Sequence, residues 1–226
     1  RDIGIKKRYP AERRFKAYGV TAILIGLFFL FVLLWTVVSK GYTAFQQTAI
    51  TLPIEFSEQI IDPKNERGAN PTKLMTANYP FLVRDALIKA LGIDPANKPL
   101  VKQATDMVSA SARNQLRDMV VANPAIIGTT ATVSLLAEGN IDSANKGQID
   151  LTVAEANRKV KDQQIEWMKK LTETGAMAKQ FNTGLFTYGA SSRPEAAGIG
   201  VAALGSLYMM LIVLVLALPI GVAASI

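Results

Sequence analysis

The 226-residue chain contains neither histidine nor cysteine, which limits the chemistry that its side chains can perform. Without imidazole or thiolate groups it cannot build the usual zinc site, a Ser-His-Asp triad or a cysteine nucleophile. The segment from Asp142 begins like a calcium-binding loop, but Ala144, Lys146 and Val153 stand where oxygen ligands are required. The chain has no P-loop for nucleotide phosphates. We therefore expect no enzymatic activity and no bound metal or cofactor.

One arginine is a candidate anion-binding residue. Arg193 lies beside Ser191 and Ser192, immediately before a long apolar run in which a helix is expected to begin. Its charge, together with the unpaired amides of a helix N-terminus, could attract an anion. The alternative, which we favour from the sequence, is that Arg193 is an interfacial anchor.

Two long uncharged runs flank the polar segment 40–195 and must position it. Residues 17–39 carry no charge, and at 1.5 Å rise per residue they span roughly 34 Å, enough for a hydrocarbon core of about 30 Å. Residues 196–226 are also uncharged and would form a helix of roughly 46 Å. We expect both runs to be transmembrane helices. A cleaved signal peptide is the weaker alternative for the first run, because the run is long and no small-residue cleavage site follows it.

The distribution of charge predicts an orientation. Residues 1–16 hold seven basic and two acidic side chains, a net charge of +5, whereas residues 40–195 hold 18 basic and 16 acidic side chains, a net charge of +2. Basic residues beside a first span are typical of the cytoplasmic side, and a long loop is exported regardless of its own charge. We expect residues 1–16 in the cytoplasm, spans at 17–39 and 196–226, and a periplasmic domain at 40–195. The basic cluster favours membrane lipid as a partner over nucleic acid.

The second run differs from the first in its small residues. They recur at i+4 spacing in two sets that share one helix face, because about three whole turns separate the sets. Such a face lets another membrane helix approach closely, although glycine and alanine are also simply common in membrane helices. Pro219 predicts a kink. The predicted helix-packing residues are Gly198, Ala202, Ser206, Ala217, Gly221 and Ser225.

The first half of the intervening segment predicts both helix and strand. Residues 48–56 favour a strand, which Pro53 restricts to a sheet edge or an extended segment. Helical spacing begins near Tyr79 and stops at Gly92, and a second long helix is expected over 99–122.

The second half continues with residues of types common in strands and then with a capping pattern. Residues 126–137 favour one or two strands, and a turn-rich stretch follows over 139–150. Thr152 and Glu155 form a capping-box pattern that predicts a helix to about Gly175. The same pattern over residues 192–195 predicts the start of the second span. The expected fold class is a mainly α membrane protein, with two transmembrane helices flanking an α-rich, or α+β, extracytoplasmic domain.

The segment 198–226 resembles the opening of the permease domain in binding-protein-dependent ABC importers, and most closely the PstA-type subunit of phosphate importers. Residues 181–186, the approach at 193–195, the basic leader and the large inserted domain are similar to the form of that subunit with an extended external region. The fixed points of the resemblance are Gly205, Ser206, Pro219 and Gly221.

This resemblance implies phosphate transport across the bacterial inner membrane. It further implies a complex of a second permease subunit, cytoplasmic ATPase subunits and a periplasmic phosphate-binding protein. We expect further spans after Ile226, where the ATPase-contacting loop of such permeases would lie, so no coupling or translocation residue is assigned.

Another class of protein has the same expected topology. A two-span sensor, such as a chemoreceptor or a histidine kinase, also places an α-rich external domain between two spans with its N-terminus inside. The small-residue face, Pro219 and the family resemblance favour the permease over the sensor. A structural or assembly role in the membrane is the third alternative.

Overall fold

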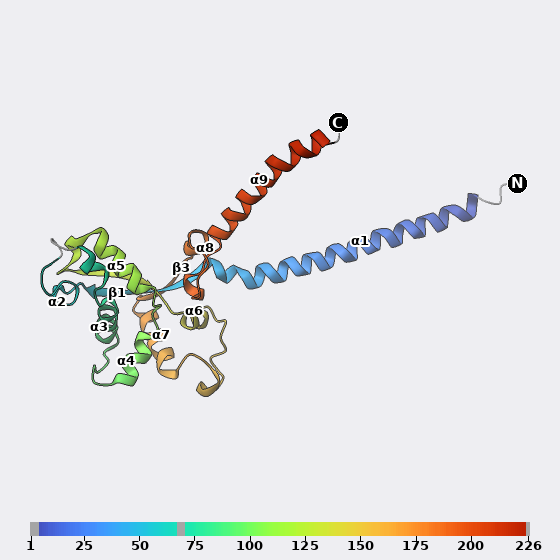
Figure 1. Ribbon diagram of the computed structural model, residues 1–226. Coiled ribbons are helices and arrows are strands. Elements are labelled where there is room, and N and C mark those ends of the chain that lie inside the picture. Colours follow the sequence, from blue (N-terminus) through green and yellow to red (C-terminus); the bar gives the residue numbers. More distant parts are fainter. Residues whose placement is uncertain (1–4, 67–70, 225–226) are drawn as a thin grey trace. The chain divides into compact units, whose positions relative to one another are not determined.

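The computed structural model describes residues 5–66 and 71–224, and Figure 1 shows its elements. Short 3₁₀ turns are labelled η. The elements in chain order are α1 (Ile5–Gly41), η1 (Tyr42–Phe45), β1 (Gln46–Glu55), α2 (Glu58–Ile61), η2 (Pro71–Met75), α3 (Tyr79–Leu91), α4 (Lys98–Thr105), α5 (Ala112–Ala122), η3 (Pro124–Ile126), β2 (Thr130–Leu136), α6 (Gly139–Asn145), η4 (Glu155–Asn157), α7 (Asp162–Glu173), β3 (Met177–Phe181), α8 (Gly184–Thr187), η5 (Pro194–Ala196) and α9 (Gly200–Ala224).

The chain divides into two compact units, residues 1–43 and 44–226. The first unit consists of helix α1, and its large apolar side chains from Phe15 onward are exposed. The second unit contains an α+β part, residues 44–199, which we call the domain, followed by α9. Both α1 and α9 are long and apolar enough to cross a membrane. The predicted helix-rich composition, with a small sheet and two such apolar helices, is therefore confirmed.

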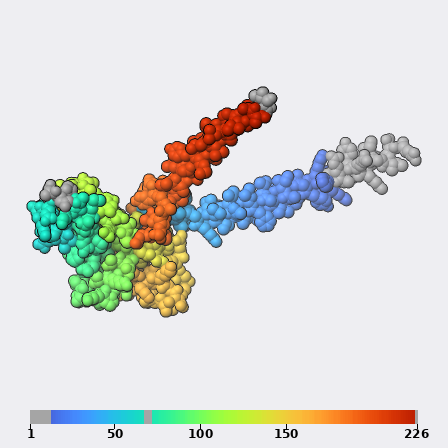
Figure 2. Space-filling model, viewed as in Figure 1, coloured from blue at the N-terminus to red at the C-terminus, as the bar shows by residue number. Residues whose placement is uncertain are grey.

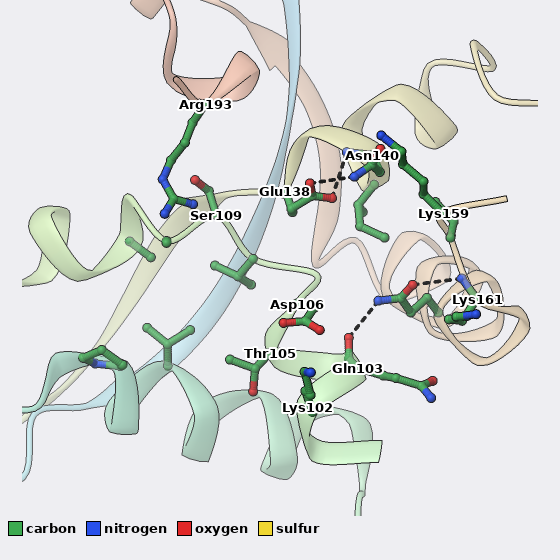
Figure 3. Close-up of a pocket in the computed structure, with 18 of the residues that line it drawn as sticks. Lys102, Gln103, Thr105, Asp106, Ser109, Glu138, Asn140, Lys159, Lys161 and Arg193 are labelled. Carbon is green, nitrogen blue, oxygen red and sulfur yellow. Dashed lines mark hydrogen bonds between the residues drawn. The ribbon is translucent and has the colours of Figure 1, made fainter. Parts of the chain in front are cut away.

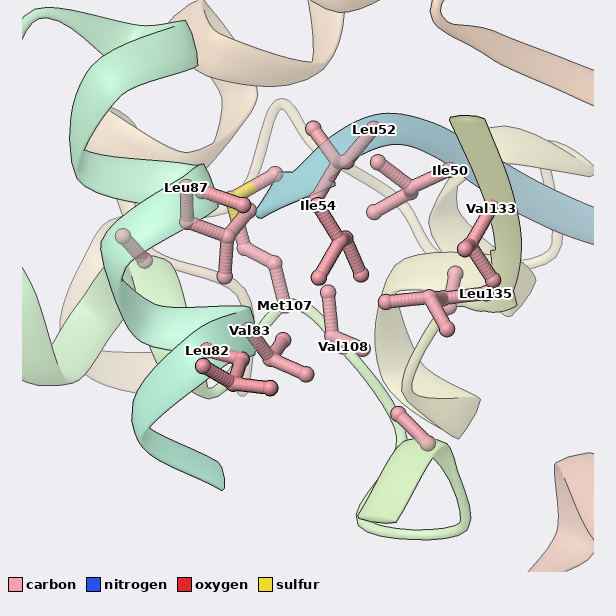
Figure 4. Packing of buried hydrophobic residues seen from close by; sticks show 14 of the residues in the cluster. Ile50, Leu52, Ile54, Leu82, Val83, Leu87, Met107, Val108, Val133 and Leu135 are labelled. Atoms are coloured by element: carbon pink, nitrogen blue, oxygen red, sulfur yellow. The ribbon is translucent and has the colours of Figure 1, made fainter. Parts of the chain in front are cut away.

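A three-stranded antiparallel sheet with strand order β2-β1-β3 lies at the centre of the domain. Side chains on one face of β1 are fully buried, because successive residues of a strand point to opposite faces and this face meets α3. Figure 4 shows these side chains between α3 and β2. The labelled members of this core are Ile50, Leu52, Ile54, Leu82, Val83, Leu87, Met107, Val108, Val133 and Leu135.

The sequence correctly predicts strand β1 but not its place in the sheet. Pro53 was expected to restrict these residues to an edge strand or an extended segment, yet β1 is the central strand. The pairing with β3 covers only Gln46–Ile50, and the Thr51 amide makes the next bond, to the Ala176 carbonyl. The backbone nitrogen of Pro53 points to the same side of β1 as that of Thr51, at a position beyond the end of β3. The N–H group that proline lacks would therefore have no strand to bond to, and the pairing of β1 with β3 is not interrupted.

Helix α3 matches its prediction because its boundary signals are local. The Asn78 side chain accepts a hydrogen bond from the Phe81 amide at 3.3 Å, and Pro80 occupies the tolerated first turn. Gly92 ends the helix with a φ of 71°, a left-handed conformation that favours glycine.

The helix predicted over 99–122 is wrong as a single element, since the structure divides it into α4 and α5. Between them the backbone pairs with the end of β2: Val108 forms a β-bridge with Ala137, and the Ser109 amide donates to the Leu136 carbonyl at 2.8 Å. Met107 is fully buried at this break. Strand-like pairing and burial of Met107 thus replace two turns of helix.

In the second half of the domain, the strand predicted within residues 126–137 is confirmed by β2, but two other predictions differ from the structure. The stretch 139–150 was expected to be rich in turns, but more than half of it forms helix α6. Thr152 does not cap a helix, because its hydroxyl donates to Asp150 at 2.6 Å, and α7 begins only at Asp162. The Lys161 amide instead donates to the Gln164 side chain at 2.9 Å, which satisfies one amide at the start of α7.

A buried ion pair lies along α6, and hydrogen bonds to Thr48 connect this helix to the sheet. Lys146 Nζ lies 2.6 Å from Asp142 Oδ2, and the two side chains are only 8% and 13% exposed. Asp142 Oδ1 accepts the Thr48 amide of β1 at 2.7 Å, while the Asn145 amide group donates to the Thr48 hydroxyl at 3.0 Å. The carboxylate of Asp142 and the ammonium group of Lys146 therefore both have a partner inside the domain.

Helix α9 begins later than the sequence predicts. Residues 192–195 were expected to start the second span, but η5 is a separate turn and α9 starts at Gly200. The Ile199 amide donates to the Leu185 carbonyl of α8 at 2.8 Å. Gly200 contacts the backbone of Phe186 so closely that a Cβ atom would clash with it. The first turn of α9 is thus packed against α8.

Candidate functional site

The domain contains a cavity of about 890 Å³ whose lining comes from five segments distant in sequence. These segments are α3, the region from α4 to the start of α5, the start of α6, the approach to α7, and the loop before α9. Figure 3 shows Arg193 on one side, with Lys159 and Lys161 on another. The lining residues are Pro80, Val83, Pro99, Lys102, Gln103, Thr105, Asp106, Val108, Ser109, Ala110, Ala112, Arg113, Glu138, Asn140, Ile141, Lys159, Val160, Lys161, Gln164 and Arg193.

The charged lining of the cavity is predominantly basic. Five of the lining side chains are basic and two are acidic, a formal net charge of +3. Lys161 Nζ lies 3.4 Å from a carboxylate of Glu155, which does not line the cavity. The other four form no ion pair within 4 Å with the acidic side chains that the structure describes, and all four are exposed; they are Lys102, Arg113, Lys159 and Arg193.

The two acidic residues of the lining do not neutralise this charge through ion pairs. Both carboxylate oxygens of Glu138 accept from Asn140, one from its backbone amide and one from its side chain, each at 2.8 Å. Asp106 is exposed. The exposed basic residues Lys102, Arg113, Lys159 and Arg193, which we call the rim of the cavity, therefore create a positive field that is available to an anion from solvent.

The floor of the cavity is apolar. Val83, Val108, Ile141 and Val160 are all at most 8% exposed. An apolar floor beneath a basic rim is the arrangement expected for a ligand with an anionic group and an apolar body.

A direct hydrogen bond joins the cavity wall to the segment that leads into α9. The buried Ser109 hydroxyl donates to Glu195 Oε1 at 2.6 Å, and the Ser111 hydroxyl donates to Ser109 at 3.0 Å. Arg193 and Glu195 thus belong to one short segment, of which Arg193 lines the cavity and Glu195 is bonded to its wall.

Arg193, the anion-binding candidate from the sequence, lies beside the cavity and not beside a long helix. The helix start invoked for it is at Gly200, seven residues further on, so amides of α9 do not reinforce its charge there. Lys102, Arg113 and Lys159 could not be predicted as site residues, because isolated basic residues on predicted surfaces carry no local signal of a shared site.

The predicted helix-packing face falls only partly on α9. Gly198 precedes the helix and donates its amide to the Gly189 carbonyl at 2.9 Å, so it packs against the α8 segment. Ala202, Ser206, Ala217 and Gly221 lie on α9, where they are exposed. Ser225 lies outside the described residues. No partner helix covers these positions within the described ranges, and their role in helix association stays a prediction.

Next to the start of α9 lies an exposed aromatic cluster. Phe186 of α8 stacks on Phe45 and on Phe181, each with 6.1 Å between ring centroids. The three rings come from α8, η1 and β3 and remain 45–61% exposed. We call these three residues the aromatic cluster.

In the described part of the domain, acidic side chains do not gather into a metal site. Among the residues that the structure places, no group of three or more acidic side chains is close enough to hold a metal ion. The cavity is consequently the main candidate for ligand binding in this part of the chain.

These features define a class: a small α+β domain with a basic cavity, bordered in the sequence by two long apolar helices. Residues 2–155 match the family described as a domain of unknown function, DUF3333. Because this match covers more than half of the chain, the chain belongs to the DUF3333 family. Comparisons with curated proteins and with solved structures find no match.

Proposed function

We propose that this chain is the N-terminal part of an ABC transporter permease subunit that moves inorganic phosphate across the bacterial inner membrane. A separate subunit would hydrolyse ATP, and a periplasmic phosphate-binding protein would deliver the solute. The observation that carries this proposal is helix α9, which is apolar on all sides and resembles the first core helix of such permeases. The resemblance over 198–226 supplies the solute and the partners.

The exposure of α9 supports a place in the membrane. None of its apolar window is buried, and its side in view is bare (Figure 2). A helix of 25 residues is about 37 Å long, which exceeds a hydrocarbon core of about 30 Å. A helix that is apolar all round requires lipid or a protein interior around it. Lipid, together with other helices of the transporter, would supply those surroundings.

The aromatic cluster supports the same reading. Aromatic side chains are enriched at membrane interfaces, where their rings settle at headgroup level. Phe186 packs next to the first turn of α9, and Phe45 follows α1 by four residues in the sequence. Phe45 is therefore close in sequence to the end of the first proposed span. Phe186 is close in space to the start of the second.

The orientation follows from charge. Residues 1–16 carry a net charge of +5 beside the first span, which favours the cytoplasm for the N-terminus and the periplasm for the domain. The absence of cysteine makes this orientation easy to test with single-cysteine variants. An impermeant maleimide added to spheroplasts should label Asp118→Cys in the domain and leave Arg14→Cys unlabelled. Labelling of Arg14→Cys alone would invert the proposed topology.

The transport function has a direct test. Deleting the gene should abolish high-affinity phosphate uptake by cells, and an intact copy should restore it. Unchanged phosphate uptake with reduced uptake of another solute would overturn the phosphate assignment. Hydrophobic spans in the gene beyond codon 226 would support a permease, whereas a charged amphipathic signalling helix there would contradict it.

The cavity favours a second candidate function. A two-span sensor needs a ligand site in its external domain and a connection from that site to a span, and residues 193–200 provide such a connection. The uptake test separates the two functions, because deleting a sensor would alter a response to the ligand and leave high-affinity uptake by an existing transporter in place.

A further inference from the structure

We propose that the basic cavity binds a small organic anion, a molecule with a phosphate or carboxylate group attached to an apolar body. This inference goes beyond the transport proposal, since the site lies in the domain and its ligand need not be the transported solute.

The anionic part of the ligand follows from the rim. Lys102, Lys159 and Arg193 reach the cavity from three different segments, and none of them is held by a carboxylate among the described residues. Three unpaired cations facing one space repel one another, and an anion placed between them relieves that repulsion. Phosphate and carboxylate oxygens are the acceptors that arginine and lysine bind best.

The organic part follows from the size and the floor. A volume of about 890 Å³ lies within the roughly 300–1,000 Å³ typical of sites for small organic ligands. The buried side chains of Val108, Ile141 and Val160 offer nothing to a hydrated inorganic ion but gain from contact with an apolar group.

A macromolecular occupant is less well supported. An acidic peptide would need an extended groove flanked by charges along its length. The basic residues here line one cavity together, from three segments distant in sequence, and do not follow one extended groove. The cavity is therefore assigned to a small molecule, and peptide binding becomes an outcome of the test.

The test uses the whole chain in nanodiscs of zwitterionic lipid, so that lipid headgroups do not supply competing net charge. Titration calorimetry compares phenyl phosphate with benzyl alcohol, inorganic phosphate and tetraglutamate. Phenyl phosphate should bind at least tenfold more tightly than either benzyl alcohol or inorganic phosphate, and its affinity should fall as salt is added. No binding of phenyl phosphate, or equal binding of benzyl alcohol, would overturn the proposal. Tighter binding of tetraglutamate would replace the small-molecule assignment with a peptide-docking site.

Variants locate the binding in the cavity. Lys159→Gln and Arg193→Gln should each weaken phenyl phosphate binding about tenfold, because each removes one charge-assisted contact. Lys169→Gln is the matched control, since Lys169 is an exposed lysine of α7 that does not line the cavity. If Lys169→Gln weakens binding as much as the cavity variants do, the affinity reflects the overall charge of the domain, and the proposed site is wrong. The transport proposal would survive that result, because uptake is measured separately on the deletion strain.

Discussion

Strand β1 and helix α9 are both rich in aliphatic residues, but their side chains meet opposite surroundings. Ile50, Leu52 and Ile54 of β1 are all 0% exposed, whereas Leu211 and Val215 of α9 are 48% and 67% exposed. In β1 the apolar residues alternate and so build one face that α3 can cover. In α9 they occupy every side of the helix, which leaves no polar face for water. The arrangement of apolar residues, more than their number, decides whether a segment packs into a protein core or requires lipid or other apolar helices around it.

The difference between β1 and α9 is tested most strongly by placing charges within α9. The double substitution Leu211→Arg with Val215→Arg should prevent α9 from crossing the membrane, because each arginine near the centre of a span costs about 2.5–3.5 kcal/mol. A cysteine at Ala224 reports the outcome: it should stay unlabelled by external maleimide in the parent chain and become labelled in the double variant. Leu211→Ile with Val215→Leu is the control. If Ala224→Cys remained unlabelled in the arginine variant, the proposal that α9 crosses the lipid bilayer would be contradicted.

Within the domain, the largest loss should come from the buried ion pair. Asp142→Ala leaves the Lys146 charge and the Thr48 amide without their partner, which should lower the free energy of unfolding by about 3–5 kcal/mol. Urea unfolding followed by Trp167 fluorescence, in a Trp35→Phe background, measures this change. Asp118→Ala is the control, because its pair with Arg117 is at the surface and should contribute at most about 1 kcal/mol. Equal effects of the two substitutions would contradict the role given to the buried pair.

The junction between the two regions can be tested with two glycines of the same helix. Gly200→Ala places a methyl group against the Phe186 backbone and should destabilise the packing of α8 on α9 by about 1–3 kcal/mol. Gly205→Ala meets open space and should be neutral or stabilising. Limited proteolysis between residues 189 and 199 should accelerate only in the first variant. The same rate in both would mean that the close contact does not hold the junction.

The smallest effect concerns a buried hydroxyl. The Tyr79 hydroxyl donates to the Leu74 carbonyl, so Tyr79→Phe should cost about 1 kcal/mol in urea unfolding. Burial raises the pKa of Tyr79 above its usual value near 10. The folded state therefore favours the neutral phenol, and this contribution is complete below pH 10 and decreases as the pH rises toward the raised pKa.

The pH dependence supplies the control. The parent chain should lose more stability than Tyr79→Phe between about pH 10 and pH 11. Parallel losses in the two chains would show that Tyr79 does not titrate with unfolding.

Some local boundary signals in the sequence, such as those of α3, predicted the ends of an element correctly, whereas the long-range pairings of the domain could not be predicted. Asn78 and Gly92 mark the ends of α3 within a few residues of chain, so the prediction holds. The break between α4 and α5 depends on Ala137, nearly thirty residues away, and helical spacing alone cannot reveal it. Strand β3 buries only Met177, so it shows no alternation that would have identified it.

The candidate site was even less accessible to sequence reasoning. Arg193 was noticed because it stands next to an apolar run, a purely local reason. Lys102 and Lys159 are 57 positions apart and look like ordinary surface lysines in sequence. Only the fold of the chain brings them to one cavity, so no spacing rule could have grouped them.

The pairing of β1 with β3 has a consequence for how such a protein could arise. Gln46, the first residue of β1, pairs with Phe181, the last residue of β3, so the segment 47–180 begins and ends at neighbouring positions. Insertions into existing proteins are tolerated best where the two ends of the inserted part lie close together. Residues 47–180, which form most of the domain, could thus be exchanged for a short turn without drawing the flanking strand ends apart.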